Sequence, residues 1–267
     1  METLPLPAAL ASLALCAGLL WSLRGFFARK ASPEAPPLKR ALPDLLLPLL
    51  GFFIGTVLVA GAYALMKGAG EESPPPLTLF ALTAAVQAAV VGIVIFVARE
   101  RGATWAHFGV HGREAGRGIQ LGFLMYLVVL PGIAGAGSLW GPLVERWQEK
   151  EAVQEVALQL QAIQGAERVP AFLLAAVLIP VLEEILFRGY FQNWAGALLG
   201  RRQGLLWTSV IFAFLHGLEP LAPLLVIAFG AGLLMHWSRN LWACMTLHVL
   251  NNSMATLVLF LAPETLP

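Results

Sequence analysis

Charged residues are scarce in this 267-residue chain, where Asp, Glu, Lys and Arg together make up only 12% of the sequence. Soluble globular domains carry about 25% charged and about 45–50% apolar residues, because their surface must meet water. Here 58% of the residues are hydrophobic and the mean hydropathy is +0.74. This composition excludes both a water-soluble globule and a disordered chain. It predicts an all-α, polytopic membrane protein built as a helical bundle.

Several other features are missing as well. The net charge is only +1, so no basic surface points to a nucleic-acid partner. The two cysteines, Cys16 and Cys244, both lie within apolar runs, so the chain has no disulfide framework. No Lys or Arg precedes the first apolar run, which argues against a cleaved signal peptide. We therefore expect the first segment to remain as a membrane anchor.

Long apolar runs divide the chain into membrane spans. A span needs about 20 mostly apolar residues. The sequence predicts about eight such spans, at residues 4–22, 42–66, 77–98, 118–140, 169–187, 204–218, 221–237 and 241–262. We interpret them as one integral membrane domain. Residues 1–168 supply the first four spans and an outer amphipathic helix at residues 143–164, and residues 169–267 supply the last four spans.

The distribution of basic residues predicts the orientation of the spans. If the N-terminus lies outside, the inside loops hold all of the 17 basic residues except Lys67, Arg146, Lys150 and Arg168. This bias agrees with the positive-inside rule. We therefore expect both termini outside, in a multi-pass protein of the cytoplasmic (inner) membrane of a bacterium.

Ionisable residues within the spans are concentrated in the second half of the chain. Each strongly charged one costs about 2.5–3.5 kcal/mol on insertion scales, so each needs a reason to be there. The first four spans hold little beyond Asp44, at a span edge, and Gln87. The last four spans contain Glu183, Glu184, Arg188, His216, His236, His248, Asn251 and Asn252. This asymmetry is the strongest functional signal in the sequence.

Helical spacing assigns different tasks to the two adjacent carboxylates. Glu184 and Arg188 are four residues apart and can form an ion pair, which could also be purely structural. Glu183 is rotated about 100° from Glu184 and lacks that partner. Removed from water, its carboxylate would be suited to take a proton from a water molecule. The alternative is that Glu183 lies near the helix end and reaches the lipid headgroups.

The remaining polar groups complete a hydrolytic site. His216 could hold the same water from the next helix, although it could also be a structural histidine. His248 and Asn252 are four residues apart, and their donors could stabilise an oxyanion formed from a peptide carbonyl. These residues predict hydrolysis of an acyl group without a covalent intermediate. No Ser/His or Cys/His arrangement in the sequence competes convincingly with this interpretation.

Three motifs in order carry a family resemblance: Glu183-Glu184-x-x-x-Arg188, Phe212-x-x-x-His216 and His248-x-x-x-Asn252. Together they resemble the CAAX prenyl protease type II family, also called Abi or CPBP intramembrane proteases. The resemblance covers about residues 170–253. It implies an eight-helix endopeptidase whose site opens toward the cytoplasm. It also implies that Glu183 and His216 activate water, that His248 and Asn252 hold the oxyanion, and that Glu184 and Arg188 support them.

Two questions about the site stay open at this point. Glu183, His216 and His248 are of metal-ligating types, but His-Glu-x-x-His is absent and no two histidines of a span are four residues apart. We prefer a mechanism without cofactor, and metal dependence is not excluded. The second question is depth. His216 lies about 21 Å along its helix from Arg202, whereas Glu183 lies only about 7 Å from Arg188. The sixth helix must therefore tilt, bend or start deeper in the membrane.

Two other functions remain alternatives. A non-catalytic scaffold or a bacteriocin-immunity type of peptide binder could use the same cavity without cutting. A proton-coupled transporter could use buried Glu, His and Arg as a relay, but the inverted repeats typical of transporters are not visible. For the protease, the expected partners are the lipid bilayer and a peptide or protein substrate, with or without a lipid group.

Overall fold

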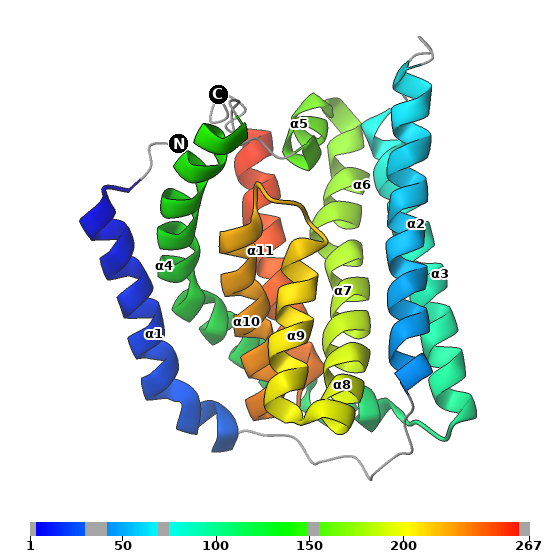
Figure 1. Cartoon of the computed structure of the whole chain (residues 1–267), viewed down its shortest axis with the longest axis vertical. Coiled ribbons are helices and arrows are strands. Elements are labelled where there is room, and N and C mark those ends of the chain that lie inside the picture. Colours follow the sequence, from blue (N-terminus) through cyan, green and yellow to red (C-terminus); the bar gives the residue numbers. More distant parts are fainter. Residues whose placement is uncertain (1–3, 30–41, 69–74, 149–154, 262–267) are drawn as a thin grey trace.

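The computed structural model describes residues 4–29, 42–68, 75–148 and 155–261, and over these residues the chain is a bundle of helices without strands (Figure 1). The predicted all-α membrane bundle is therefore confirmed. The α-helices are α1 Leu6–Arg29, α2 Leu42–Gly68, α3 Pro76–Glu100, α4 Ala115–Gln148, α5 Glu155–Ala162, α6 Arg168–Phe172, α7 Ile179–Glu184, α8 Asn193–Leu199, α9 Arg201–Phe214, α10 Leu221–Ser238 and α11 Leu241–Leu261.

Six helical stretches are long and apolar enough to cross a bilayer, counted over the described residues. They are Leu6–Arg29, Pro76–Glu100, Gly112–Gln148, Gly165–Leu199, Leu221–Ser238 and Leu241–Leu261. The other two predicted spans are helical as well, but α9 has only 14 residues. At 1.5 Å per residue it reaches about 21 Å, less than the roughly 30 Å of a hydrocarbon core. The number of eight membrane crossings therefore stays a prediction.

Successive helix ends lie at alternating ends of the bundle. The start of α1 and the end of α11 lie at the same end (Figure 1, top), and the turns from α8 to α9 and from α10 to α11 lie at the other. This arrangement fits the predicted alternation of the spans. Residues 1–3 and 262–267 lie outside the described part of the chain, and the side of the membrane on which the termini lie stays a prediction.

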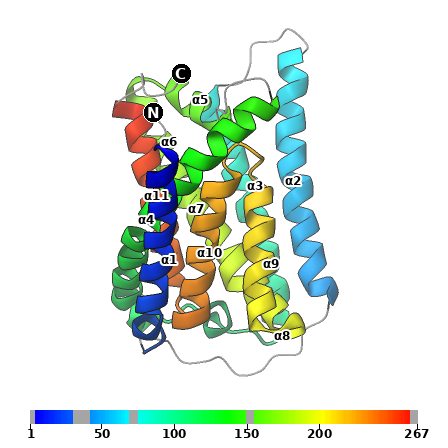
Figure 2. The same ribbon diagram turned by 60° about the vertical axis from the view of Figure 1, so that its left-hand side comes forward.

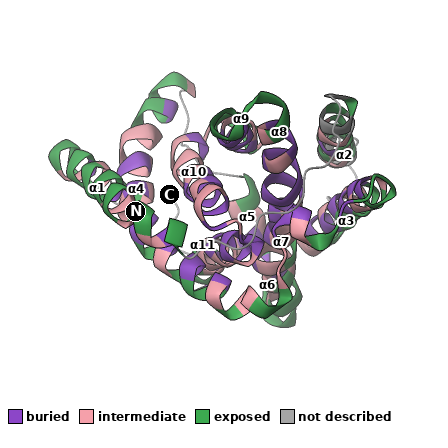
Figure 3. Cartoon of the chain, turned by 90° about the horizontal axis from the view of Figure 1, so that it is seen from below, coloured by how far each residue is buried: buried purple, intermediate pink, exposed green. Residues whose placement is uncertain are grey.

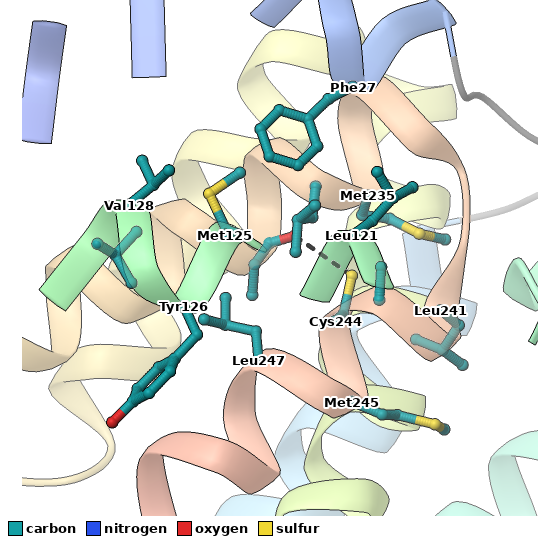
Figure 4. Close-up of a cluster of buried hydrophobic side chains, with 14 of the residues drawn as sticks. Phe27, Leu121, Met125, Tyr126, Val128, Met235, Leu241, Cys244, Met245 and Leu247 are labelled. Atoms are coloured by element: carbon teal, nitrogen blue, oxygen red, sulfur yellow. Dashed lines mark hydrogen bonds between the residues drawn. The ribbon is translucent and has the colours of Figure 1, made fainter. Parts of the chain in front are cut away.

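The main apolar core lies between α1, α4, α10 and α11 (Figure 4). Met125 of α4 and Leu247 of α11 are completely buried there. Gly122 lets α4 and α11 approach closely, since a Cβ at this position would lie 2.4 Å from the backbone oxygen of Ala243. Seen along the bundle, buried residues gather on α7, α10 and α11, whereas α1 and α3 are exposed along their outer sides (Figure 3). The central helices thus form a rigid support for polar groups.

A second core of aromatic rings fills the bundle near α8. It joins Phe108, in the loop after α3, to the helix that carries the acidic pair and to α9. Tyr190 stacks on Trp194 with the ring centroids 4.3 Å apart, and Phe187 meets Phe212 edge to face at 5.1 Å. By contrast, α2 lies at the edge of the bundle beside α3 (Figures 1 and 2).

The predicted outer amphipathic helix at residues 143–164 is divided in the structure. Its first part, with Leu143 and Trp147, is the last turns of α4, which continues to Gln148 with Pro131 and Pro142 inside it. Its second part is the short helix α5, and residues 149–154 lie outside the described ranges. The first part of the predicted helix thus continues a membrane span, and the outer amphipathic helix as a whole stays a prediction.

Candidate active site

The acidic pair lies in the middle of one long helical rod, Gly165–Leu199. In this rod α7 is flanked by two π-helical segments, Leu173–Leu178 and Ile185–Gln192. Such wide turns inside helices are frequent at functional sites. Glu183 and Glu184 are 5% and 1% exposed, respectively. The alternative in which Glu183 reaches the headgroups from a helix end is therefore wrong.

The length of this rod also answers the question of depth. The rod does not end near residue 187 but continues to Leu199, turns at Gly200 with φ 98°, and α9 then runs back from Arg201. Glu183 lies about 25 Å before this turn and His216 about 24 Å after it, counted at 1.5 Å per residue. The two residues therefore reach the same level without a special tilt of α9.

The imidazole of His216 is oriented by its own helix. Its Nδ1 lies 2.8 Å from the backbone oxygen of Phe212, and because a carbonyl only accepts, Nδ1 carries the hydrogen. The Nε2 atom of the neutral ring therefore has a free lone pair. It lies 3.9 Å from Oε2 of Glu183.

The imidazole of His248 repeats this arrangement from α11. Its Nδ1 lies 3.0 Å from Oε1 of Glu184 and donates to that carboxylate. Its Nε2 lies 3.8 Å from Oε2 of Glu183. Two imidazole nitrogens thus point at one carboxylate oxygen, at distances too long for direct hydrogen bonds. This spacing suits a small bridging molecule, such as a water, that touches all three groups.

Arg188 and Phe212 fix the surroundings of the two histidines. The Nε atom of Arg188 lies 3.6 Å from Oε2 of Glu184, and its Nη2 donates to the backbone oxygen of Ala228 on α10. The fully buried ring of Phe212 contacts Arg188, His216 and His248, with centroid distances of 4.9, 4.6 and 5.6 Å. The second predicted motif therefore places a packing surface next to its histidine.

Asn252 lies near this group, but among the described contacts it does not hydrogen-bond to the two glutamates or the two histidines. It is on α11, one turn after His248, and its Nδ2 donates to the backbone oxygen of Ala175 in the first π-helical segment at 3.4 Å. Asn251 donates to the Oδ1 atom of Asn252. The structure thus brings together five of the six predicted site residues. The role of Asn252 at the oxyanion stays a prediction.

Gln87 is the site residue to which the sequence analysis gave no role. Its Nε2 donates to Oε1 of Glu183 at 3.0 Å, from the middle of α3. The residue is 5% exposed. No spacing rule connects α3 with α7, because the two residues are 96 positions apart. The only available signal was a single strong polar group in an otherwise apolar span.

The side chains that could ligate a metal ion are the same three that face each other. Glu183, His216 and His248 have suitable atoms, and both Nε2 atoms have no other close partner among the residues that the structure describes. Among the described residues, no group of three or more His, Cys, Asp or Glu side chains is arranged to hold a metal ion. The donor set is therefore of the right type but more open than a metal site.

Comparison with known proteins gives one match. The family model described as Type II CAAX prenyl endopeptidase Rce1-like matches residues 165–254, the part of the chain that contains all six predicted site residues. No curated protein and no solved structure matches the chain. The resemblance inferred from the three motifs is therefore confirmed.

Proposed function

We propose that this membrane protein, a member of the Rce1-like type II CAAX prenyl endopeptidase family over residues 165–254, hydrolyses a peptide bond within the bilayer with water activated by Glu183 and His216. The observation that carries the proposal is the convergence of two imidazole Nε2 atoms on Oε2 of Glu183, at 3.8 and 3.9 Å. Oε2 of Glu183 and Nε2 of His216 can accept the two hydrogens of a single water molecule and polarise it, while Nε2 of His248 lies close enough to donate to the oxyanion that forms.

The first step of the reaction follows from this geometry. The water between Glu183 and His216 attacks the carbonyl carbon of the peptide while its proton passes to Glu183. The carbonyl oxygen becomes an oxyanion. His248 in its charged form donates from Nε2, and the Nδ2 atom of Asn252 donates as well, after leaving the backbone oxygen of Ala175. Glu184 stabilises the imidazolium of His248 because it accepts the hydrogen of Nδ1.

The second step returns the proton. Glu183 passes it to the nitrogen of the peptide, the C–N bond breaks, and the products are a carboxylic acid and an amine. No residue of the chain forms a bond to the substrate. We propose that no metal is required, since the groups of the chain supply both the base and the oxyanion donors.

The substrate is proposed to be a peptide or protein with a segment at the membrane, with or without a prenyl group. The bilayer is the second partner, and the protein is proposed to lie in the inner membrane of a bacterium. The support for this assignment is the family match together with the apolar spans.

The experiment is peptide cleavage by the purified protein in lipid vesicles. A mixed peptide library that includes prenylated CAAX peptides is incubated with the wild type, and the products are identified by mass spectrometry. Glu183→Gln is expected to lower cleavage by at least about a hundredfold, the range lost with a general base. Glu167→Gln is the matched control, since Glu167 is exposed at the start of the same rod and is expected to keep full activity.

A parallel assay with a metal chelator distinguishes a mechanism that needs a metal ion from one that does not. Cleavage that survives chelation supports the mechanism without metal, and cleavage that is lost and then restored by a divalent metal contradicts it. Equal activity of Glu183→Gln and wild type would overturn the assignment of the base. If no peptide in the library is cut, the protease is contradicted and a non-catalytic peptide binder is favoured.

A further inference from the structure

A hollow of about 230 Å³, with a mainly apolar surface and several polar side chains, lies between α2, α3 and α5. It runs from α5, at one end of the bundle, to the middle of α3. Five of its eight lining residues have side chains that can form hydrogen bonds, although the hollow lies between membrane helices. The lining residues are Thr56, Val59, Leu79, Thr83, Val86, Gln87, Glu155 and Gln159.

The mixed lining of this hollow suits an occupant that carries both apolar and polar groups. Helices that face lipid or each other in a membrane are lined by apolar and small residues, and polar groups there need partners or water. One water molecule takes about 30 Å³ of liquid volume, so the hollow has room for several waters or for a short piece of extended peptide. An extended peptide carries unpaired N–H and C=O groups that such a lining can bind.

Gln87 connects the hollow with the carboxylate of Glu183. A carboxylate accepts hydrogen bonds, so the NH₂ group of Gln87 must face Oε1 of Glu183, and its Oε1 must point elsewhere. That oxygen is buried, and it has no hydrogen-bond donor among the described residues. Because a buried acceptor without a donor is unfavourable, Gln87 is suited to receive a donor from a bound molecule.

Toward α8, the surroundings of Glu183 are filled by aromatic side chains. Phe187, Tyr190, Trp194 and Phe212 are each at most 1% exposed. Their rings pack against one another. On the side of α3, the hollow instead places polar side chains next to Gln87, which holds Glu183.

We propose that this hollow is a peptide-binding subsite: it receives the segment beside the bond to be cut, and Gln87 accepts an N–H of that segment while its amide group holds Glu183. The proposal rests on the proposed function, because it supplies the binding site for the same reaction. It makes Gln87 a positioning residue for Glu183 as well as a contact of the substrate. Gln87 lies outside residues 165–254, so the family match does not assign it.

The first test blocks the hollow without altering the fold. Thr83 lines the hollow, whereas its neighbour Leu82 is 44% exposed on the surface of α3. Thr83→Cys and Leu82→Cys are each reacted with a bulky maleimide in detergent, reconstituted, and assayed with a peptide that the wild type cuts. The native Cys16 and Cys244 are buried and give little background.

Modified Thr83→Cys is expected to show a KM raised at least tenfold, and modified Leu82→Cys a KM within about twofold of wild type. Wild-type KM for the modified Thr83→Cys protein would overturn the proposal. Failure of Thr83→Cys to react would also overturn it, since a hollow that admits a peptide must admit the reagent. Neither result would touch the proposed function, which stands on cleavage by the wild type.

The second test removes the hydrogen bonds of Gln87. Gln87→Leu keeps most of the side-chain volume, and it is expected to lower kcat/KM about ten- to a hundredfold, the worth of a hydrogen bond to a charged group. The loss is expected in kcat as well as KM, with an unchanged Tm, and Gln87→Asn is expected to recover part of the activity. An unchanged kcat/KM, or a loss that only follows a lower Tm, would contradict the assigned role.

Discussion

At the scale of single residues, the site separates the tasks of two carboxylates that are neighbours in the sequence. Glu184 accepts from His248 and pairs with Arg188, so its charge is balanced on both sides. Among the described residues, Glu183 accepts only from the neutral amide of Gln87, and its other oxygen faces two imidazole nitrogens without a direct hydrogen bond. Adjacent positions on a helix point about 100° apart, and this rotation supports the proposal that Glu184 is structural and Glu183 is the base.

This separation predicts a stability effect for the Glu184–Arg188 pair. Glu184→Gln leaves the fully buried guanidinium of Arg188 without a counter-charge, which is expected to lower the stability by about 3–5 kcal/mol. Arg188→Met is expected to cost a similar amount for the reverse reason. The double variant is expected to cost clearly less than the sum, because no unpaired charge remains. Thermal unfolding in detergent measures all three variants.

The comparison with Glu183 serves as the control for that cycle. Glu183→Gln removes a carboxylate that has no cationic partner in the neutral-histidine state, so its unfolding midpoint is expected to stay near that of wild type. Additive losses in the Glu184–Arg188 cycle would mean that the two residues act independently, and the ion pair would then make no contribution of its own to stability.

The sequence could predict the contacts that lie within one helix but not those between distant helices. The spacing of four residues predicted the neighbourhood of Glu184 and Arg188, and the motif order predicted His216 and His248. The bond from Gln87 to Glu183 depends on how α3 packs on α7, which no local pattern encodes. The partner of Asn252 was missed for the same reason, since Ala175 lies 77 positions away.

At the scale of elements, the long rod shows where hydropathy misleads. The apolar run was expected to end near residue 187, and Arg188, Gln192 and Asn193 follow it in the sequence. The structure buries Arg188 and Gln192 inside the protein and partly buries Asn193. Gln192, for example, donates to the backbone oxygen of Gly232 at 2.8 Å. A polar side chain that is satisfied inside the bundle does not end a membrane helix, and sequence patterns cannot distinguish this case from a true helix end.

The hairpin between α8 and α9 yields a prediction for this element. A Cβ at Gly204 would lie 2.5 Å from the backbone nitrogen of Gly196 and 2.8 Å from the backbone oxygen of Gln192. Since these are backbone atoms, Gly204→Ala must push α9 away from α8 and displace His216 at its far end. We expect a destabilisation of about 1–3 kcal/mol and a parallel loss of cleavage. Thermal unfolding and the cleavage assay test both effects.

Gly92 provides the matched control, because a Cβ there meets nothing within 4 Å. Gly92→Ala on α3 is expected to keep both the unfolding midpoint and the activity. If Gly204→Ala behaves like Gly92→Ala, the close contact of α8 with α9 is not needed to set the level of His216.

At the scale of the whole molecule, the position of the hollow and the distribution of basic residues together predict which side of the membrane the hollow faces. The hollow begins at α5, at the end of the bundle where α1 starts and α11 ends. Arg29, Arg201 and Arg239 lie at the ends of α1, α9 and α10 on the opposite side. The positive-inside rule therefore predicts that the hollow faces the outside. The family resemblance instead implies an opening toward the cytoplasm, so the two expectations disagree for this hollow.

Labelling of single cysteines in intact cells decides between them. Glu155→Cys on α5 and Arg202→Cys at the start of α9 are both exposed positions, at opposite ends of the bundle. With a membrane-impermeant maleimide, we expect Glu155→Cys to react in intact cells and Arg202→Cys to react only after permeabilisation. The wild type, with its buried cysteines, is the control for background.

The reverse labelling pattern would mean that the basic residues do not set the orientation, and the hollow would then receive peptides from the cytoplasm. The expected pattern would instead require substrates that reach the site from the outer side or from within the bilayer.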